Sequence, residues 1–174
     1  MACTHLFGWS TMVLNCSSLN LAFEGMMGAD MTTDQIKSAA RKIIESGWNR
    51  GDFTALREMI DSNYVNYDAT LRQAVRGIDG LQNFITSWRT SFPDLNLHLL
   101  DVIAEGEKAV CRWRLTGTQE GDFSHFPPSH RKVTVEGVEI YRFSNGKLVE
   151  NWSYWNTDAL LQQIGAQSQS ALDY

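Results

Sequence analysis

The side chains best suited to proton transfer lie in one short extended segment, Tyr64–Asp68. Asp68 ends the segment beside Tyr64 and Tyr67, and aromatic neighbours that exclude water raise the pKa of a carboxyl group. The Tyr67 phenol keeps its proton at neutral pH, so it suits either a hydrogen-bond donor or a wall aromatic. Two interpretations of Asp68 stay open: a general acid or base, and a cap for the turn at Ala69–Thr70.

The sequence gives little support to a metal, a redox centre or a nucleic acid partner. Its four histidines and three cysteines are scattered, without C-x-x-C or H-x-x-x-H spacing. Cys111 stands alone in a strand-like run, as a small buried residue does. The formal net charge is −5 and no run of Lys or Arg occurs, which argues against a nucleic-acid-binding surface. We therefore expect no metal site.

The first part of the chain differs from the rest, because residues 1–30 contain no Lys or Arg. A signal peptide needs a positive start and an uninterrupted apolar core. We expect residues 1–30 to be a disordered extension or a stretch ahead of the true start at Met31. Residues 31–166 are then one domain and residues 167–174 a polar tail. No stretch approaches the ~20 apolar residues of a membrane span, so a soluble, cytoplasmic protein is expected.

Three helices are predicted in the first half of that domain. The first begins at a capping box, Thr32 with Gln35, and its apolar residues keep helical spacing as far as Trp48. Asp52 caps a shorter second helix. The third lies around residues 81–88, ahead of Pro93.

Beyond Pro93 apolar and polar residues alternate, as they do in strands. Four long strands are predicted, at residues 95–99, 109–118, 132–143 and 147–155. Asn145-Gly146 is typical of a hairpin turn, and a final helix covers residues 159–164. Helices gathered ahead of an antiparallel sheet are typical of an α+β fold. A long twisted sheet packed on the N-terminal helices is able to curl around one of them and leave a cavity between them.

One predicted strand carries two arginines on a single face. Arg112 and Arg114 lie opposite Trp113, and the simplest expectation pairs them with acids such as Glu139 on the neighbouring strand. An anion site is the alternative.

Seven short motifs give the chain a resemblance to a known family. They are Trp48-Asn-Arg-Gly-Asp52, Tyr64-Val-Asn-Tyr-Asp68, Phe92-Pro-Asp-Leu95, Arg112-Trp-Arg-Leu-Thr-Gly-Thr118, Pro127-Pro128, Arg142-Phe143 and Glu150-Asn-Trp152. In this order, over about residues 34–166, they resemble the SnoaL-like polyketide cyclases and ester cyclases of the superfamily named after nuclear transport factor two. The resemblance implies the cone-shaped fold, which also hosts isomerases, dehydratases, epoxide hydrolases and domains that only bind or dimerise.

In the cyclases, the resemblance implies an intramolecular aldol closure run by a histidine and an aspartate, without a metal or a cofactor. This chain lacks that histidine–aspartate pair at the expected positions. Tyr67 and Gln119 stand where family members commonly carry histidine, and Asn156 stands where many carry aspartate. Side-chain amides do not titrate in the useful range. Either the chemistry has moved to other groups, or the pocket binds without reacting.

The resemblance also selects the residues of the predicted pocket. It places Asp68 on the wall and His125, in a loop with His130, on the rim as a reserve base. The predicted catalytic residues are Asp68, Tyr67 and His125, and the predicted ligand-binding residues are Asn66, Trp113, Gln119, Trp152, Tyr154 and Asn156. Three of these, Trp152, Tyr154 and Asn156, share one parity, and the aromatic ones suit a plain core equally well.

Functions of two different kinds remain open. The first is a cofactor-free cyclase, isomerase or lyase that acts on a hydrophobic polyketide-like molecule by general acid–base chemistry. The second is a non-catalytic domain that binds small molecules or dimerises. An epoxide hydrolase needs an Asp-Arg-Asp relay, and no such trio stands out. The resemblance further implies a homodimer. The negative net charge and the lack of a long apolar stretch argue against a nucleic acid or a membrane as partner.

Overall fold

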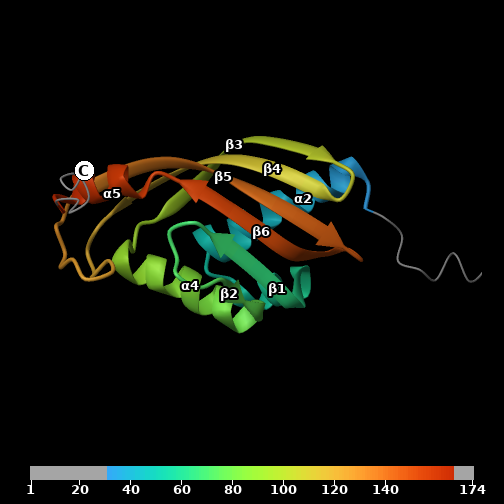
Figure 1. Cartoon of the computed structure of the whole chain (residues 1–174), viewed down its shortest axis with the longest axis horizontal. Helices are drawn as coiled ribbons and strands as arrows, with labels where there is room; N and C mark the ends of the chain where they lie inside the picture. The colour runs from blue at the N-terminus through green and yellow to red at the C-terminus, as the bar shows by residue number, and fades with distance from the viewer. Residues whose placement is uncertain (1–30, 167–174) are drawn as a thin grey trace, which may run out of the picture.

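A computed structural model of the chain describes residues 31–166, so the predictions for residues 1–30 and 167–174 concern residues outside it. The predicted α+β fold is confirmed. Its elements in chain order are α2 (Thr33–Ile43), a π-helical turn (Ile44–Asn49), α3 (Phe53–Met59), β1 (Ile60–Asp68), β2 (Val75–Arg76), α4 (Gly77–Ser91), β3 (Asn96–Glu105), β4 (Lys108–Thr118), β5 (Lys132–Ser144), β6 (Lys147–Trp155) and α5 (Thr157–Ile164) (Figure 1). No helix within these residues combines the length and the apolar character required to cross a membrane.

Side-chain hydrogen bonds hold the start of α2 and the end of the π-helical turn that follows it. Thr32 and Gln35 form the predicted capping box at its start. At the other end, the side chain of Asn49 donates to Leu97 O (3.1 Å) and accepts from Leu97 N (2.8 Å). These two bonds tie the π-helical turn to β3, where Trp48 of that turn reaches the cavity described below.

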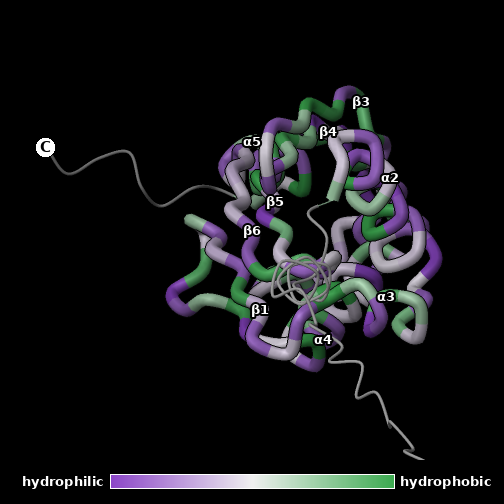
Figure 2. Tube along the Cα trace, turned by 90° about the vertical axis from the view of Figure 1, so that its right-hand side faces the viewer, coloured by the Kyte–Doolittle hydropathy of each residue, from purple (hydrophilic) through white to green (hydrophobic). Residues whose placement is uncertain are grey.

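The sheet has the strand order β2-β1-β6-β5-β4-β3. The last four strands form the predicted antiparallel meander, whereas β1 pairs in parallel with β6. The sheet is therefore mixed, because β1 precedes α4 in the chain and meets β6 only through a long connection. In Figure 2 the strands descend from β3 to β1 on one side, while α2 and α3 lie on the other. The sheet stays open as it curls over the helices.

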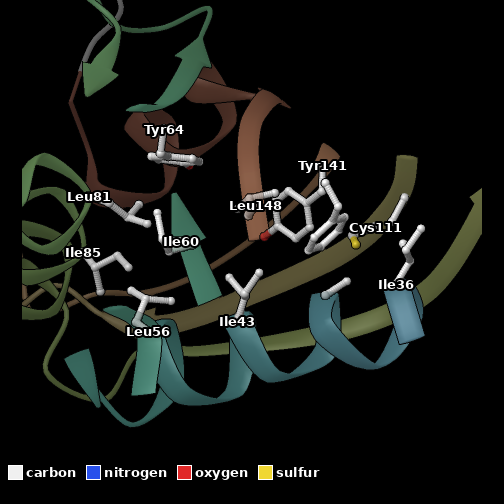
Figure 3. Close-up of a cluster of buried hydrophobic side chains, with 13 residues drawn as sticks. Ile36, Ile43, Leu56, Ile60, Tyr64, Leu81, Ile85, Cys111, Tyr141 and Leu148 are labelled. Atoms are coloured by element: carbon white, nitrogen blue, oxygen red, sulfur yellow. The ribbon is translucent and has the colours of Figure 1, made fainter. Parts of the chain in front are cut away.

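Two apolar clusters fill the space between the sheet and the helices. The first joins α2, α3 and α4 to the inner face of the strands and includes Ile36, Leu56, Tyr64 and Tyr141 (Figure 3). The second, built mainly from aromatic residues and the final helix, includes Trp88, Phe92, Trp113 and Leu160. The candidate site lies at the boundary between the two clusters.

Candidate active site

A single row of polar residues crosses the concave face of the sheet. Strand register aligns Asp68 with Ser153, Ser153 with Glu139, and Glu139 with Cys111. All four side chains are buried, and neighbouring strands lie about 4.8 Å apart. Burial raises the pKa of the Cys111 thiol to about 12, so this cysteine remains a protonated core residue, as predicted for a lone strand cysteine.

Glu139 is the buried carboxyl group in the middle of the row. Burial raises its pKa to about 8, and the nearby Asp68 carboxylate acts in the same direction. The nearby polar side chains of Asn151, Ser153 and Trp113 lower this pKa again, but by less. Ser153 Oγ donates to Glu139 Oε1 over 2.9 Å. Glu139 therefore holds its proton at neutral pH and is able to donate it, which an ordinary glutamate is not.

The predicted pairing of Glu139 with the arginines of β4 is wrong. Arg114 pairs with Glu136 (2.6 Å) and Arg112 with Asp101 (2.7 Å), all on the outer face. Glu139 has the opposite parity to Glu136 along β5, so its side chain enters the fold instead.

Asp68 closes the other end of the row. Its Oδ1 accepts from Thr70 N (2.8 Å) and Thr70 Oγ1 (2.7 Å), which is the turn-capping arrangement. Its Oδ2 accepts from Trp155 Nε1 over 3.3 Å, and both residues line the cavity. The two interpretations of Asp68 are thus compatible in geometry: one oxygen holds the turn and the other faces inward.

The cavity has a large outer chamber and a small inner one. The outer chamber, about 590 Å³, lies among α4, the 122–126 loop and Trp155. The inner chamber, about 20 Å³, has Glu139, Ser153 and Trp113 in its wall. The chambers are neighbours, because both are lined by Asp68, Phe84, Trp88 and Trp155.

Aromatic side chains form most of the walls. Trp88 is central, with its ring centroid 5.4 Å from that of Trp155, 5.0 Å from Phe123 and 6.3 Å from Trp48. Edge-to-face contacts of this kind fix the rings relative to one another. The walls thus present rigid apolar surfaces to a flat ligand. Within residues 31–166, no three His, Cys, Asp or Glu side chains gather closely enough to ligate a metal ion.

The rim of the outer chamber is a short hairpin, and hydrogen bonds from the Gln119 side chain hold it in place. The backbones of Phe123 and Phe126 exchange two hydrogen bonds of 3.0 Å, so His125 lies at the tip, beside the outer chamber. Gln119 is fully buried. Its Nε2 donates to the carbonyls of Gly121, Phe126 and Pro127, and its Oε1 accepts from Ser129 N. Gln119 braces the loop and is not among the residues that line either chamber.

Three of the predicted site residues lie on the outer face of the sheet. Tyr67 and Trp152 stack on each other there, with ring centroids 5.8 Å apart, and Tyr154 is 54% exposed. The prediction that Trp152 and Tyr154 point into the pocket is therefore wrong. The parallel register of β1 with β6 turns Ser153 and Trp155 inward instead, and successive residues of a strand face opposite sides.

Two of the predicted ligand-binding residues, both asparagines, make hydrogen bonds that stabilise the fold instead. Asn156 accepts from Ala159 N (2.9 Å) as the N-cap of α5, rather than facing the pocket with the parity of Trp152. Asn66 is buried and accepts from Asn151 Nδ2 over 3.0 Å, in the next inward-facing row, two residues along β1 from Asp68. Of the predicted set, Asp68, Trp113 and His125 line the chambers.

Glu139, Ser153 and Trp155 were missed as site residues. For Glu139 a usable signal exists in the sequence: it occupies the same parity as the apolar Val133, Val135, Tyr141 and Phe143. A carboxyl group in an otherwise apolar row is buried, and buried carboxyl groups with perturbed pKa values concentrate at functional sites.

Comparison with known proteins identifies the family and the fold. The family model of SnoaL-like polyketide cyclases matches residues 38–164. No curated protein matches the chain at a significant level.

Solved structures share the fold. A candidate SnoaL-like polyketide cyclase from Jannaschia Sp. CCS1 is 27% identical with a TM-score of 0.73, covering 81% of this chain and 100% of its own. TsrD from Streptomyces laurentii is 26% identical with a TM-score of 0.71, covering 79% of this chain and 100% of its own. IdmH from Streptomyces antibioticus, at 24% identity, 76% and 99% coverage and a TM-score of 0.67, is similar in fold.

Proposed function

Because the chain belongs to the SnoaL-like polyketide cyclase family, we propose that it cyclises, isomerises or dehydrates a hydrophobic polyketide-like ketone in this cavity. The observation that carries the proposal is the buried Glu139 carboxyl, which faces the inner chamber across Ser153 from Asp68. Two carboxyl groups in unlike environments are suited to opposite roles, one as acid and the other as base.

The roles follow from what each group is able to exchange. Asp68 accepts hydrogen bonds at both oxygens, and as a carboxylate it removes a proton from the carbon beside a ketone. The electron pair left on that carbon makes an enolate. The enolate carbon bonds to a second carbonyl carbon of the same molecule, whose oxygen takes the proton of Glu139. Return of the first proton from Asp68 to Glu139 restores both groups.

The remaining parts of the site supply position rather than protons. Rigid aromatic walls hold the chain folded, which replaces a bimolecular encounter by a unimolecular one. His125 at the rim is a reserve base for substrate atoms that lie in the outer chamber. The proposed chemistry needs no cofactor.

The alternative is a domain that binds its ligand without reaction. The supporting observation is that Gln119 and Asn156, at positions where relatives carry titrating groups, serve as a loop brace and a helix cap. The two functions differ in one measurable respect, since only an enzyme exchanges protons with the ligand.

The test compares Glu139→Gln with Glu136→Gln, a matched control on the outer face of the same strand. An aromatic 1,5-diketone, whose terminal methyl ketone closes a six-membered ring onto the second carbonyl, is incubated with each protein in heavy water, and deuterium uptake above the protein-free rate and ring closure are followed by NMR. We expect Glu139→Gln and Asp68→Asn to lower the rate about 100- to 10,000-fold, and Glu136→Gln to leave it unchanged. Equal rates for Glu139→Gln and the unaltered protein would remove Glu139 from the mechanism. Binding without any exchange would favour the alternative.

We also propose that the protein forms a homodimer through the outer face of its sheet. A second register row crosses that face and is apolar along its length: Tyr67, Trp152, Ile140, Val110 and Ile103. Two pairs of flanking charges already neutralise each other within the chain, Arg112–Asp101 and Arg142–Glu150. Two copies therefore meet there without net repulsion, and burial of the apolar row stabilises the pair.

Sedimentation velocity tests the dimer with the double variant Val110→Lys/Ile103→Lys. The lysines introduce like charges into the contact, so we expect monomers from the variant and dimers from the unaltered protein. A monomeric unaltered protein at micromolar concentration would reject the proposal.

A further inference from the structure

Two buried polar atoms beside the inner chamber have no hydrogen-bond partner among the described residues: Trp113 Nε1 and Glu139 Oε2. A buried polar group left without a partner costs about 1–3 kcal/mol, so such groups in native proteins usually meet a ligand or a water. A third such atom, Asn151 Oδ1, belongs to the adjoining register row. Two unpartnered polar atoms on residues that line one chamber indicate that something polar occupies it.

The two atoms are close to each other. The Trp113 side chain is near enough to lower the pKa of the Glu139 carboxyl, although its N–H makes no hydrogen bond to that carboxyl, and both residues line the inner chamber. Trp113 is also fixed in place by Gly137, its partner across β4 and β5. A methyl group at Gly137 would lie 2.8 Å from Trp113 Cη2, so only glycine leaves room for the ring in this orientation.

The size of the chamber limits what it accepts. Its volume of about 20 Å³ exceeds the roughly 10–15 Å³ that one water molecule needs and is too small for a ring. The neighbouring outer chamber, about 590 Å³, has room for several rings. A ligand whose body lies in the outer chamber is thus able to place one oxygen atom in the inner one.

We infer that the inner chamber is a binding subsite for a single carbonyl oxygen of the ligand, which accepts hydrogen bonds from Trp113 Nε1 and from the Glu139 carboxyl. The inference deepens the proposed function and rests on it. Glu139 is a donor here because burial keeps its proton in place at neutral pH. Two donors that meet one oxygen stabilise the negative charge that develops on it during bond formation. Trp113 is then a catalytic residue that touches the substrate.

The experiment compares two ligands of the same skeleton, the bicyclic ketone tetralone and the hydrocarbon tetralin. We expect the unaltered protein to bind tetralone at least about tenfold more tightly, because only the ketone satisfies both donors. Trp113→Phe keeps the ring and removes the N–H, so it should weaken tetralone binding about 5- to 30-fold and leave tetralin within twofold. Glu139→Gln keeps an amide donor and should retain the preference, although it abolishes turnover.

Trp48→Phe is the control, because Trp48 lines the same chamber and makes no part of the proposed subsite. It should change the affinity for both ligands by the same factor. As a measurement free of any effect on folding, the indole N–H resonance of Trp113 in the unaltered protein should shift downfield with tetralone and not with tetralin.

Equal affinity for the two ligands, with no shift of the Trp113 resonance, would overturn the inference and leave a water in the inner chamber, while the cavity would still stand as the ligand site. Failure of both ligands to bind would overturn the cavity proposal together with the inference. A matching loss of both ligands in Trp113→Phe would reduce Trp113 to a packing role.

Discussion

The two faces of the curled sheet are built from alternating residues of the same strands and have opposite properties. On the concave face, the row through Asp68, Ser153 and Glu139 is polar, buried and enclosed by aromatic rings. On the convex face, the row through Tyr67, Trp152 and Ile140 is apolar and partly exposed. A shift of one residue in register would exchange the two rows. Strand pairing therefore decides which residues meet a ligand and which meet a partner chain.

The largest expected difference between the two faces is in how the free energy of unfolding depends on pH. The folded-state pKa of Glu139, about 8, lies above its ordinary value of 4.5. The stability associated with protonated Glu139 is complete below the unfolded pKa and is lost as pH rises through the folded pKa. Between pH 5 and 8 we expect the free energy of unfolding to fall by about 1 kcal/mol per pH unit relative to Glu139→Gln. Urea unfolding at each pH measures this, with Glu136→Gln as the control that keeps the slope.

The next largest expected effect is a difference in stability loss between substitutions at two neighbouring residues of β6. Trp155 packs on Trp88 and donates to Asp68, whereas Tyr154 is largely exposed. We expect Trp155→Ala to lower the free energy of unfolding by about 3 kcal/mol and Tyr154→Ala by less than about 1 kcal/mol. Equal losses of unfolding free energy in the two monomeric variants would contradict the expectation that the concave face contributes more to stability than the convex face.

A smaller effect tests how tightly the concave face is packed. Gly137→Ala adds one methyl group against Trp113 and Trp155, and overpacking of this kind costs about 1–3 kcal/mol. The neighbouring Val138→Ala, on the other face, removes atoms without any clash. Thermal unfolding compares the two, and Gly137→Ala should also weaken the preference for tetralone because Trp113 is displaced.

The smallest effect on the folded monomer is expected at the convex face. Tyr67→Ser removes a ring that stacks on Trp152 and is 42% exposed. Its loss should change monomer stability by less than about 1 kcal/mol and yet weaken self-association, as measured by sedimentation equilibrium. Unchanged association would restrict the dimer contact to the β3–β4 part of the apolar row.

Local signals in the sequence were enough to predict most of the element order, although the π-helical turn and the short strand β2 were not predicted. The Thr32–Gln35 capping box, the alternation beyond Pro93 and the Asn145-Gly146 turn each depend on neighbouring residues only, and each is present in the structure. The resemblance to SnoaL-like proteins supplied the curl of the sheet, which the order of elements does not determine.

The inward face of β6 was not predictable in the same way. Aromatic residues occupy both parities there, Trp152 and Tyr154 on one side and Trp155 on the other, so hydrophobicity alone does not choose between them. The choice is made by the parallel pairing of β6 with β1, far away in the chain. On β5, by contrast, the alternation was clear, and Glu139 was misassigned because a charge pair with β4 was the simpler expectation.

The brace that Gln119 forms has a consequence for product release. A hairpin held by four side-chain hydrogen bonds and by backbone bonds to the end of α4 keeps the mouth of the cavity at one width. A linear, pliable precursor passes such an opening end first, whereas a fused-ring product is stiffer and broader. We expect departure, rather than bond formation, to limit turnover, and accumulating product to inhibit the protein.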